Sequence, residues 1–247
     1  MGETTSFEGK VVLVTGSSSG IGEASARRFD ERGATVVVNS ARSIDAGQAV
    51  ARSLRSASYI QAEVGSEEAA ETLISTVLER HGQLDVLVNN AGTTAMIPHQ
   101  EIGAASLDVW RRIFEVNVFG TWAVTVAAVP ALRASKGAVI NVSSIAGLRP
   151  TGSSIPYAAS KAALNHQTVL LAKVLGPEIR VNAVAPGLVD TPWTADWDVV
   201  RDFVAAAAPL KRTATADDVS AVIVALAELD YVTGDVVVVD GGLTLAT

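Results

Sequence analysis

The 247-residue chain is 49% apolar and carries a formal net charge of −7, with a sequence pI of about 5.0. Its length fits one large domain or two small ones, and its apolar content supplies a sizeable core, which excludes a disordered chain. The acidic balance without a basic cluster argues against nucleic acid and anionic membranes as partners, and the absence of cysteine excludes disulfides, thiolate catalysis and Cys-ligated metal.

The sequence also lacks signals for membrane insertion or metal binding. Met1–Gly9 is polar and has no apolar stretch of the kind found in signal peptides. The longest uncharged run, Val116–Leu132, is shorter than the ~20 residues that a membrane-spanning helix needs. The three histidines show no metal-ligand spacing. We therefore expect a cytoplasmic protein that binds no metal and no membrane.

The first elements of the chain predict a nucleotide site. Lys10–Thr15 is a short, β-branched run typical of a strand buried on both faces. Gly16–Gly22 follows with the spacing G-x-x-x-G-x-G, and a helical stretch runs from Glu23 to Arg32. A strand, a glycine-rich turn and a helix N-terminus together bring backbone N–H groups up to a phosphate. The spacing differs from the common G-x-G-x-x-G pattern, but the flanking elements favour dinucleotide binding over a flexible loop.

The second strand, Ala34–Asn39, completes a β-α-β unit and suggests which cofactor binds. At this position an acidic residue usually binds the 2′-hydroxyl of the adenosine ribose and selects NAD. Here Ser40 and Arg42 follow the strand without a carboxylate, which favours the 2′-phosphate of NADP. The alternative, that Arg42 only begins the next helix as a solvated charge, is equally open.

The alternation of strands and helices continues to the C-terminus. Further strands are expected at Tyr59–Val64, Leu84–Val88, Val139–Ser144, Ile179–Val184 and Val236–Val239. This pattern predicts an α/β fold in one domain over residues 1–247: a doubly wound, seven-stranded parallel sheet of the Rossmann type with helices on both faces. The turn Asn89–Gly92 lies at a strand's carboxyl end, where such sheets bind ligands.

One expected helix carries a polar residue among apolar neighbours. Ser106 can cap a helix that runs toward Leu132. Asn117 lies midway along it, and its apolar neighbours predict that it is buried with a hydrogen-bonding partner. Such an asparagine alone is more often structural than catalytic.

Tyr157 and Lys161 lie one turn apart on one face of another helix. Pro156 suits the first turn of that helix, and Ser153 and Ser154 are candidate N-caps. The helix N-terminus and the ammonium group both favour phenolate, so the pair predicts a lowered pKa for Tyr157 and an acid–base role. The alternative is a surface tyrosine stacked on a lysine stem.

The motifs taken together resemble the single-domain short-chain dehydrogenases/reductases over nearly the whole chain. The resemblance is carried by Thr15-Gly16-x-x-x-Gly20-Ile21-Gly22, Asn89-Asn90-Ala91-Gly92, Asn117, Ser144, Tyr157-x-x-x-Lys161 and Pro186-Gly187-x-x-x-Thr191. Several ordered motifs at the family's spacing are far more specific than any one of them.

The resemblance implies a catalytic set of Asn117, Ser144, Tyr157 and Lys161. Tyr157 would pass a proton to or from the substrate oxygen, and Ser144, 13 residues before it as in the family, would hold that oxygen. Lys161 would bind the nicotinamide ribose and lower the Tyr157 pKa, while Asn117 would hold a water that relays protons. The nicotinamide would carry out the hydride chemistry.

The resemblance also implies a set of residues that bind the cofactor. Thr191 would bind the carboxamide, and Glu63 replaces the Asp that many members carry near the adenine. The full set is Gly16, Ser18, Ser19, Gly20, Ile21, Gly22, Ser40, Arg42, Glu63, Val64, Asn90, Ala91, Gly92, Tyr157, Lys161, Pro186, Gly187 and Thr191.

The activity implied is an NAD(P)-dependent interconversion of a ketone and a secondary alcohol, with NADPH preferred. Alternatives are a 3-oxoacyl-carrier-protein reductase, an epimerase or dehydratase, whose members are usually longer, and a non-catalytic dinucleotide sensor or scaffold. A carrier protein is acidic and needs a basic patch on its partner. Only Arg133, Lys136 and Arg149 are scattered near the site, which favours a free small molecule.

A lid is expected at about residues 191–210, over an apolar substrate. Its Trp193, Trp197 and Phe203 would face the substrate, with Met96 on the opposite wall. The expected substrate-binding residues are Met96, Ser144, Tyr157, Trp193 and Trp197. The alternative is that both tryptophans only pack the segment onto the core.

A homotetramer is expected, because family members usually pair through the two long helices, here those with Asn117 and Tyr157, and through the last strand. The apolar tail, Leu243–Ala246, would be buried at a partner.

Overall fold

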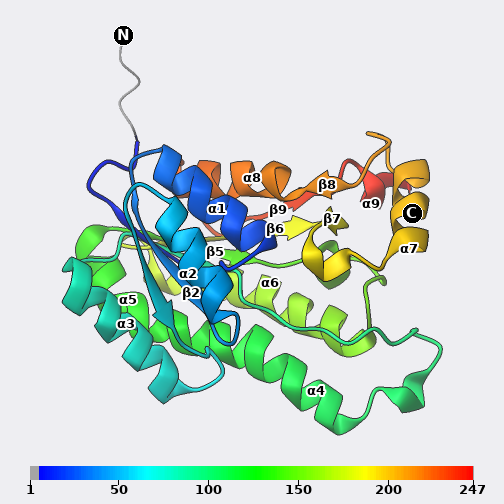
Figure 1. Ribbon diagram of the computed structural model, residues 1–247. Helices are drawn as coiled ribbons and strands as arrows, with labels where there is room; N and C mark the ends of the chain where they lie inside the picture. The colour runs from blue at the N-terminus through cyan, green and yellow to red at the C-terminus, as the bar shows by residue number, and fades with distance from the viewer. Residues whose placement is uncertain (1–5, 247) are drawn as a thin grey trace.

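The computed structural model describes residues 6–246 and places seven parallel strands of this range in one sheet (Figure 1). The order β3-β2-β1-β4-β5-β6-β9 reverses direction beside β1, as in a doubly wound fold. The strands are β1 (Val11–Val14), β2 (Thr35–Ser40), β3 (Ala57–Gln61), β4 (Val86–Asn89), β5 (Ala138–Val142), β6 (Arg180–Pro186) and β9 (Val236–Val239). The predicted Rossmann-type sheet is confirmed, and the expectation for Met1–Gly9 lies largely outside the described residues.

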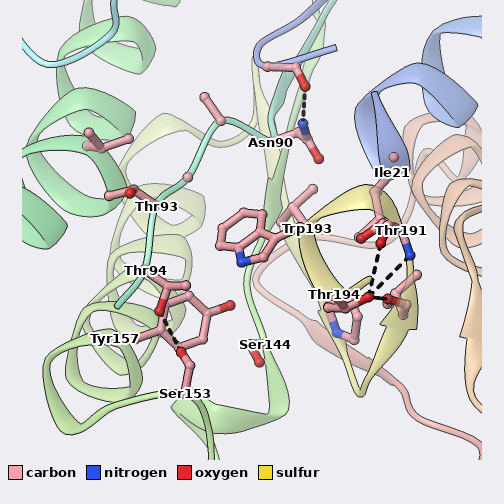
Figure 2. A pocket seen from close by; sticks show the side chains of 18 of the residues that line it. Ile21, Asn90, Thr93, Thr94, Ser144, Ser153, Tyr157, Thr191, Trp193 and Thr194 are labelled. Carbon is pink, nitrogen blue, oxygen red and sulfur yellow. Dashed lines mark hydrogen bonds between the residues drawn. The ribbon is translucent and has the colours of Figure 1, made fainter. Parts of the chain in front are cut away.

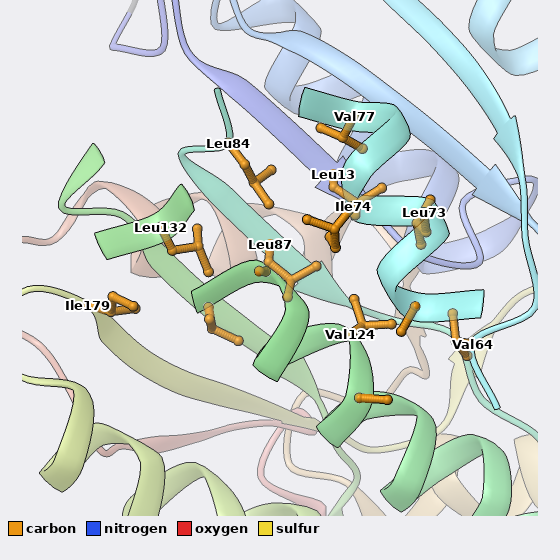
Figure 3. Packing of buried hydrophobic residues seen from close by; sticks show 14 of the residues in the cluster. Leu13, Val64, Leu73, Ile74, Val77, Leu84, Leu87, Val124, Leu132 and Ile179 are labelled. Atoms are coloured by element: carbon orange, nitrogen blue, oxygen red, sulfur yellow. The ribbon is translucent and has the colours of Figure 1, made fainter. Parts of the chain in front are cut away.

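Helices cover both faces of this sheet because its strands alternate apolar side chains between two cores. Leu13 faces the core under α3, α5 and α6, while Val12 faces the core under α1, α2 and α8. Figure 3 shows the first core, with Leu73 and Ile74 of α3 packed over the sheet beside Val124 of α5. The helices are α1 (Gly20–Glu31), α2 (Ile44–Ser53), α3 (Glu67–His81), α4 (Leu107–Phe114), α5 (Thr121–Ser135), α6 (Ile155–Leu175), α7 (Asp198–Ala207), α8 (Ala216–Glu228) and α9 (Leu243–Ala246).

The predicted helix after Ser106 forms, with one irregular turn. The Ser106 hydroxyl accepts a hydrogen bond from the N–H of Val109 at 3.4 Å and caps α4. A π-helical turn, Glu115–Gly120, then joins α4 to α5. A Cβ at Gly120 would lie 2.4 Å from the carbonyl oxygen of Val64, so only glycine allows this close packing. Turns of this type are frequent at functional sites.

The combined helix Leu107–Ser135 is longer than its uncharged run suggested. With 29 residues and a mean hydropathy of 1.4 in its most apolar window, it is long and apolar enough to cross a membrane by length and composition. Half of that window is buried in the structure. Val124 and Leu132 of α5 are fully buried in the core, which is typical of a core helix of a soluble protein.

Two smaller differences from the predicted elements affect the ligand-binding edge. The third strand ends at Gln61 instead of Val64, so Glu63 and Val64 lie in the loop at the carboxyl edge of the sheet. A second, two-stranded sheet pairs β7 (Val189–Asp190) with β8 (Ala214–Thr215), and the short helix η4 (Pro192–Thr194) and α7 lie between them. The small sheet was not predicted, because strands of two residues carry no periodic pattern.

Candidate active site

A cavity of about 930 Å³ opens at the carboxyl ends of the central strands, on the edge where the predicted residues gather. Its walls come from the glycine-rich turn, the ends of β2 and β4, the N-terminus of α6 and η4. Figure 2 shows Tyr157 and Ser144 on one side, Thr191 on the other and the Trp193 ring between them. The volume is at the upper end of the usual range for ligand sites and suits a large ligand such as a dinucleotide.

The first turn of α6 holds Tyr157 at the cavity wall. The Ser154 hydroxyl accepts a hydrogen bond from the N–H of Tyr157 at 3.4 Å and caps the helix, with Pro156 in the first turn as predicted. Ser153, the other candidate cap, instead bonds the hydroxyl of Thr94 at 2.5 Å. Thr94 was not predicted, because it lies in a loop whose sequence has no periodicity.

Ser144 follows β5 and lies beside the phenol of Tyr157. Its oxygen accepts a hydrogen bond from the N–H of Ala146 at 3.1 Å, and its side chain lies close enough to the Tyr157 hydroxyl to lower the pKa of that group. The adjacent Ser143 is buried and donates to the carbonyl of Lys161 at 3.3 Å. Of the two serines, Ser144 is therefore the one placed to hold a substrate oxygen.

The predicted lowering of the Tyr157 pKa is wrong for this structure. Burial raises the pKa of Tyr157 from 10.0 to about 12, and the hydrogen bond with Ser144 lowers it by less. The Nζ of Lys161 donates to the carbonyl of Val142 at 2.8 Å and lies over the Tyr157 ring, 5.7 Å from its centroid. Burial in turn lowers the pKa of Lys161 from 10.5 to about 8.

Asn117 is fully buried with partners, which confirms that part of its prediction. Its oxygen accepts from the N–H of Thr93 at 2.8 Å, and its nitrogen donates to the Thr93 carbonyl and to the Ser160 hydroxyl, each at 3.0 Å. A Cβ at Gly92 would lie 3.4 Å from the Asn117 oxygen and 3.8 Å from Lys161 Nζ. Gly92 thus lies between the amide and the ammonium group.

The glycine-rich turn has the geometry of a phosphate cradle. Gly16 has a φ of +63°, and a Cβ there would lie 2.9 Å from the Cα of Ala91. The N-cap of α1, Ser19, makes no side-chain capping bond within the described residues. The first N–H groups of α1 therefore remain available to an anion, whereas α3, α4, α6 and α8 are capped by hydroxyl groups. The turn fits the pyrophosphate of a dinucleotide.

Asn39 and Asn90 hold this turn in place. The Asn39 oxygen accepts from the N–H of Gly16 at 3.3 Å, and the Asn90 nitrogen donates to the carbonyls of Thr15 and Gly16 at 2.9 and 3.0 Å. Asn39 was predicted only as the last residue of a strand. Its position directly after a β-branched run, opposite the turn, is the signal that could have identified it.

The two residues expected at the adenosine end differ in exposure. The Ser40 hydroxyl is buried, donates to the carbonyl of Ser43 at 3.0 Å and bonds the Tyr59 hydroxyl at 2.9 Å. Arg42 projects into solvent with its side chain 91% exposed, and its nearest ion-pair distance, 3.8 Å, is to Glu63. Arg42 is therefore free to approach a ligand, whereas the Ser40 hydroxyl already has protein partners.

The structure brings most of the expected substrate-side residues into the cavity. Met96, Trp193 and Trp197 line it, and a Cβ at Gly92 would lie 3.7 Å from the Trp193 ring. Phe203 is 58% exposed and is not among the lining residues of the described range. The expectation that Phe203 faces the substrate is wrong, because the amphipathic α7 turns Val204 inward instead.

Comparisons with known proteins define the class to which this site belongs. The chain matches the family described as enoyl-(acyl carrier protein) reductase over residues 16–244. It is 51% identical to the "granaticin polyketide synthase putative ketoacyl reductase 2" of Streptomyces violaceoruber, covering 98% of this chain and 99% of that protein. It is 36% identical to the 3-oxoacyl-acyl-carrier-protein reductase FabG of Thermotoga maritima, covering 97% and 99% of the two chains.

A solved structure agrees with this assignment. The crystal structure of a "putative short-chain dehydrogenase/reductase" from Burkholderia xenovorans superimposes with a TM-score of 0.90 at 38% identity, covering 96% of this chain and 98% of that one. The chain belongs to the short-chain dehydrogenase/reductase family. It is an NAD(P)-dependent oxidoreductase that interconverts ketones and alcohols.

Proposed function

We propose that the chain is an NADPH-dependent ketone reductase in which Tyr157 donates the proton. The observation that carries the proposal is the Tyr157 phenol beside Ser144 at the wall of the cavity. Ser144 would hold the substrate oxygen, and Asn117 would hold a water that relays protons to Lys161. The Tyr157 phenol, whose pKa is raised by burial from 10.0, is protonated at neutral pH in the free protein, as a proton donor must be.

The cofactor would lie along the carboxyl edge of the sheet. The N-terminus of α1 and the turn from Gly16 to Gly22 would bind its pyrophosphate, and Lys161 with Tyr157 its nicotinamide ribose. Thr191 lies across the cavity from Tyr157 and would bind the carboxamide. The nicotinamide supplies the hydride when it is bound.

The preference for NADPH rests on Arg42. Its guanidinium is solvent-exposed at the cavity rim, beside the end of β2. A guanidinium binds a phosphate through paired hydrogen bonds, and residues 39–43 at the end of β2 contain no carboxylate for a ribose hydroxyl. Ser40 would contribute through its backbone, because its hydroxyl is bonded within the protein.

The substrate would be a ketone next to an apolar group, held between Met96 and the two tryptophans of the lid, residues 191–210. A 3-oxoacyl thioester is the second candidate, favoured by the ketoacyl reductases among the relatives and by Arg112 at the cavity wall. Turnover of NADPH and NADH with simple ketones, a 3-oxoacyl thioester of a small thiol and the carrier-bound form tests both. Activity with none of them would refute the proposal.

The protein would be a cytoplasmic homotetramer of single-domain chains. Apolar side chains remain exposed on the outer faces of the two long helices: Phe119, Trp122 and Val126 on one, and Val169, Leu170 and Val174 on the other. Soluble monomers rarely expose contiguous apolar patches of this kind. In the C-terminal tail, Leu243 is buried by its own chain and Leu245 is exposed. Sedimentation at micromolar concentration tests the tetramer, and a monomer would contradict it.

A further inference from the structure

One guanidinium holds three parts of the segment that covers the cavity. Arg201 of α7 donates through Nε to Asp190 at 2.9 Å and through Nη2 to the carbonyl of Thr194 at 3.0 Å. Its Nη1 donates to Asp198 at 2.5 Å. The Arg201 side chain is 28% exposed, whereas that of Asp198 is 83% exposed. The first two bonds join separate elements, and the third is a surface pair within one helix.

Asp190 is itself anchored to the rest of the fold. It lies in β7, which pairs with β8 through Val189 and Ala214. Its second carboxylate oxygen accepts a hydrogen bond from the buried Thr213 hydroxyl at 2.6 Å. The bonds from Thr213 and Arg201 hold the Asp190 pKa below its ordinary value, so the carboxylate stays charged at neutral pH. Arg201 thus attaches η4 and α7 to a fixed point.

The segment held in this way presents Thr191 and Trp193 to the cavity. The Thr194 hydroxyl donates to the carbonyl of Val189 at 2.6 Å and accepts from the N–H of Thr191 at 3.2 Å, which closes a tight turn. Trp193 projects from this turn toward Gly92, on the opposite wall. Figure 2 shows the Thr191–Thr194 bond and the tryptophan ring beside Tyr157.

We propose that Arg201 and Asp190 are positioning residues that hold Thr191 and Trp193 over the reacting groups. The inference rests on the proposed function for the roles of Thr191 and Trp193. An exposed loop is otherwise mobile, and a loop that must be ordered when a ligand binds lowers the affinity for that ligand. The planar fork of an arginine can bond a carboxylate and a carbonyl at once, which a lysine cannot. Asp198 contributes little, since an exposed ion pair is weak.

The test compares Arg201→Met and Asp190→Asn with the matched control Asp198→Asn. The first two variants should raise the NADPH dissociation constant and the KM for ketone by roughly tenfold with little change in kcat. The control should stay within about twofold. The double variant Arg201→Met/Asp190→Asn should be little worse than Arg201→Met, because both changes break the Arg201–Asp190 contact and an asparagine at position 190 can still accept the bond from Thr213. Arg201→Lys should recover part of the loss.

Limited proteolysis without any ligand separates this inference from the proposed function. Cleavage between residues 191 and 210 should be faster in Arg201→Met than in the native protein or in Asp198→Asn. If the native protein reduces no ketone but this difference appears, the proposed function fails and the positioning contact stands. Equal effects of Asp198→Asn and Arg201→Met, or a loss of thermal stability with unchanged cleavage, KM and NADPH affinity, would overturn the inference. Arg201→Lys replaces Arg201→Met if the latter does not fold.

Discussion

The two walls of the cavity are built in different ways. On one wall, Tyr157 and Lys161 come from α6, Asn117 from the turn that joins α4 to α5, and Ser144 from the end of a central strand, and Asn117 and Lys161 are almost completely buried. On the other, residues 191–210 form short helices whose Trp193 and Phe203 are largely exposed, held by ion pairs at the surface. Under the proposed function, proton transfer would depend on a fixed scaffold, while substrate choice would depend on a segment that is held by few contacts.

The largest effect is expected for Tyr157→Phe, which removes only the phenolic proton donor from the buried wall. Turnover should fall by about 10²–10⁴-fold, the usual contribution of a general acid. NADPH binding, followed by nicotinamide fluorescence, and thermal stability should change little. Near-native turnover would mean that another group donates the proton. The wall that carries Tyr157 would then not be the one responsible for proton transfer.

A second test uses the buried charge of Lys161. The pKa of Lys161 is about 8 in the folded protein and 10.5 in an unperturbed lysine, which represents the unfolded chain. Between these two pH values the folded state therefore binds fewer protons than the unfolded state. The free energy of unfolding of the cofactor-free protein should therefore rise with pH through this window, by at most about 1.4 kcal/mol per pH unit. Tyr157, with its pKa raised from 10.0 to about 12, acts in the opposite sense above pH 10.

Lys161→Met should remove the rise. Denaturant titrations of both proteins between pH 8 and 10 measure it, and parallel curves would contradict the burial of a titrating amine. If Lys161 can be protonated in the folded protein without loss of stability, this wall lies closer to solvent than the structure shows.

The scaffold wall was largely predictable from the sequence, for physical reasons. Its strands are β-branched runs, its helices begin at Ser106 and Ser154 with standard caps, and the Tyr157–Lys161 spacing fixes one helix face. The Tyr157 pKa was not predictable, because the sequence shows the nearby helix end and ammonium but not the burial that outweighs them. Desolvation is a property of the folded surroundings.

The opposite wall was less predictable. Its position after Pro186-Gly187 and its aromatic content were visible, and both of its expected substrate residues, Trp193 and Trp197, do line the cavity. Which side chains turn inward was not, as the exposed Phe203 shows. The bond between Arg201 and Asp190 joins residues 11 positions apart in different elements, and no local pattern encodes such a contact.

A smaller effect is expected at the rim, where Arg42 belongs to neither wall. Arg42→Ala should weaken NADPH binding by about tenfold, comparable with the loss of one charge-assisted hydrogen bond. NADH binding should be nearly unchanged, because it has no 2′-phosphate. Titration of both cofactors by nicotinamide fluorescence measures the ratio. Tighter binding of NADH than of NADPH to the native protein would overturn the proposed preference.

The smallest and most selective effect is expected for Trp193→Ala. The side chain is 47% exposed, so its removal should leave the fold intact and change only the cavity. The KM for bulky apolar ketones should rise several-fold, because an aromatic contact contributes about 0.5–1.5 kcal/mol beyond the area it buries. The KM for small polar ketones should change less, and kcat should be retained because the opposite wall is untouched. Trp193→Phe serves as the control, since it keeps an aromatic face. An equal rise in KM for both classes of ketone would mean that Trp193 only packs its own segment. The two walls would then not divide between them the proton transfer and the choice of substrate.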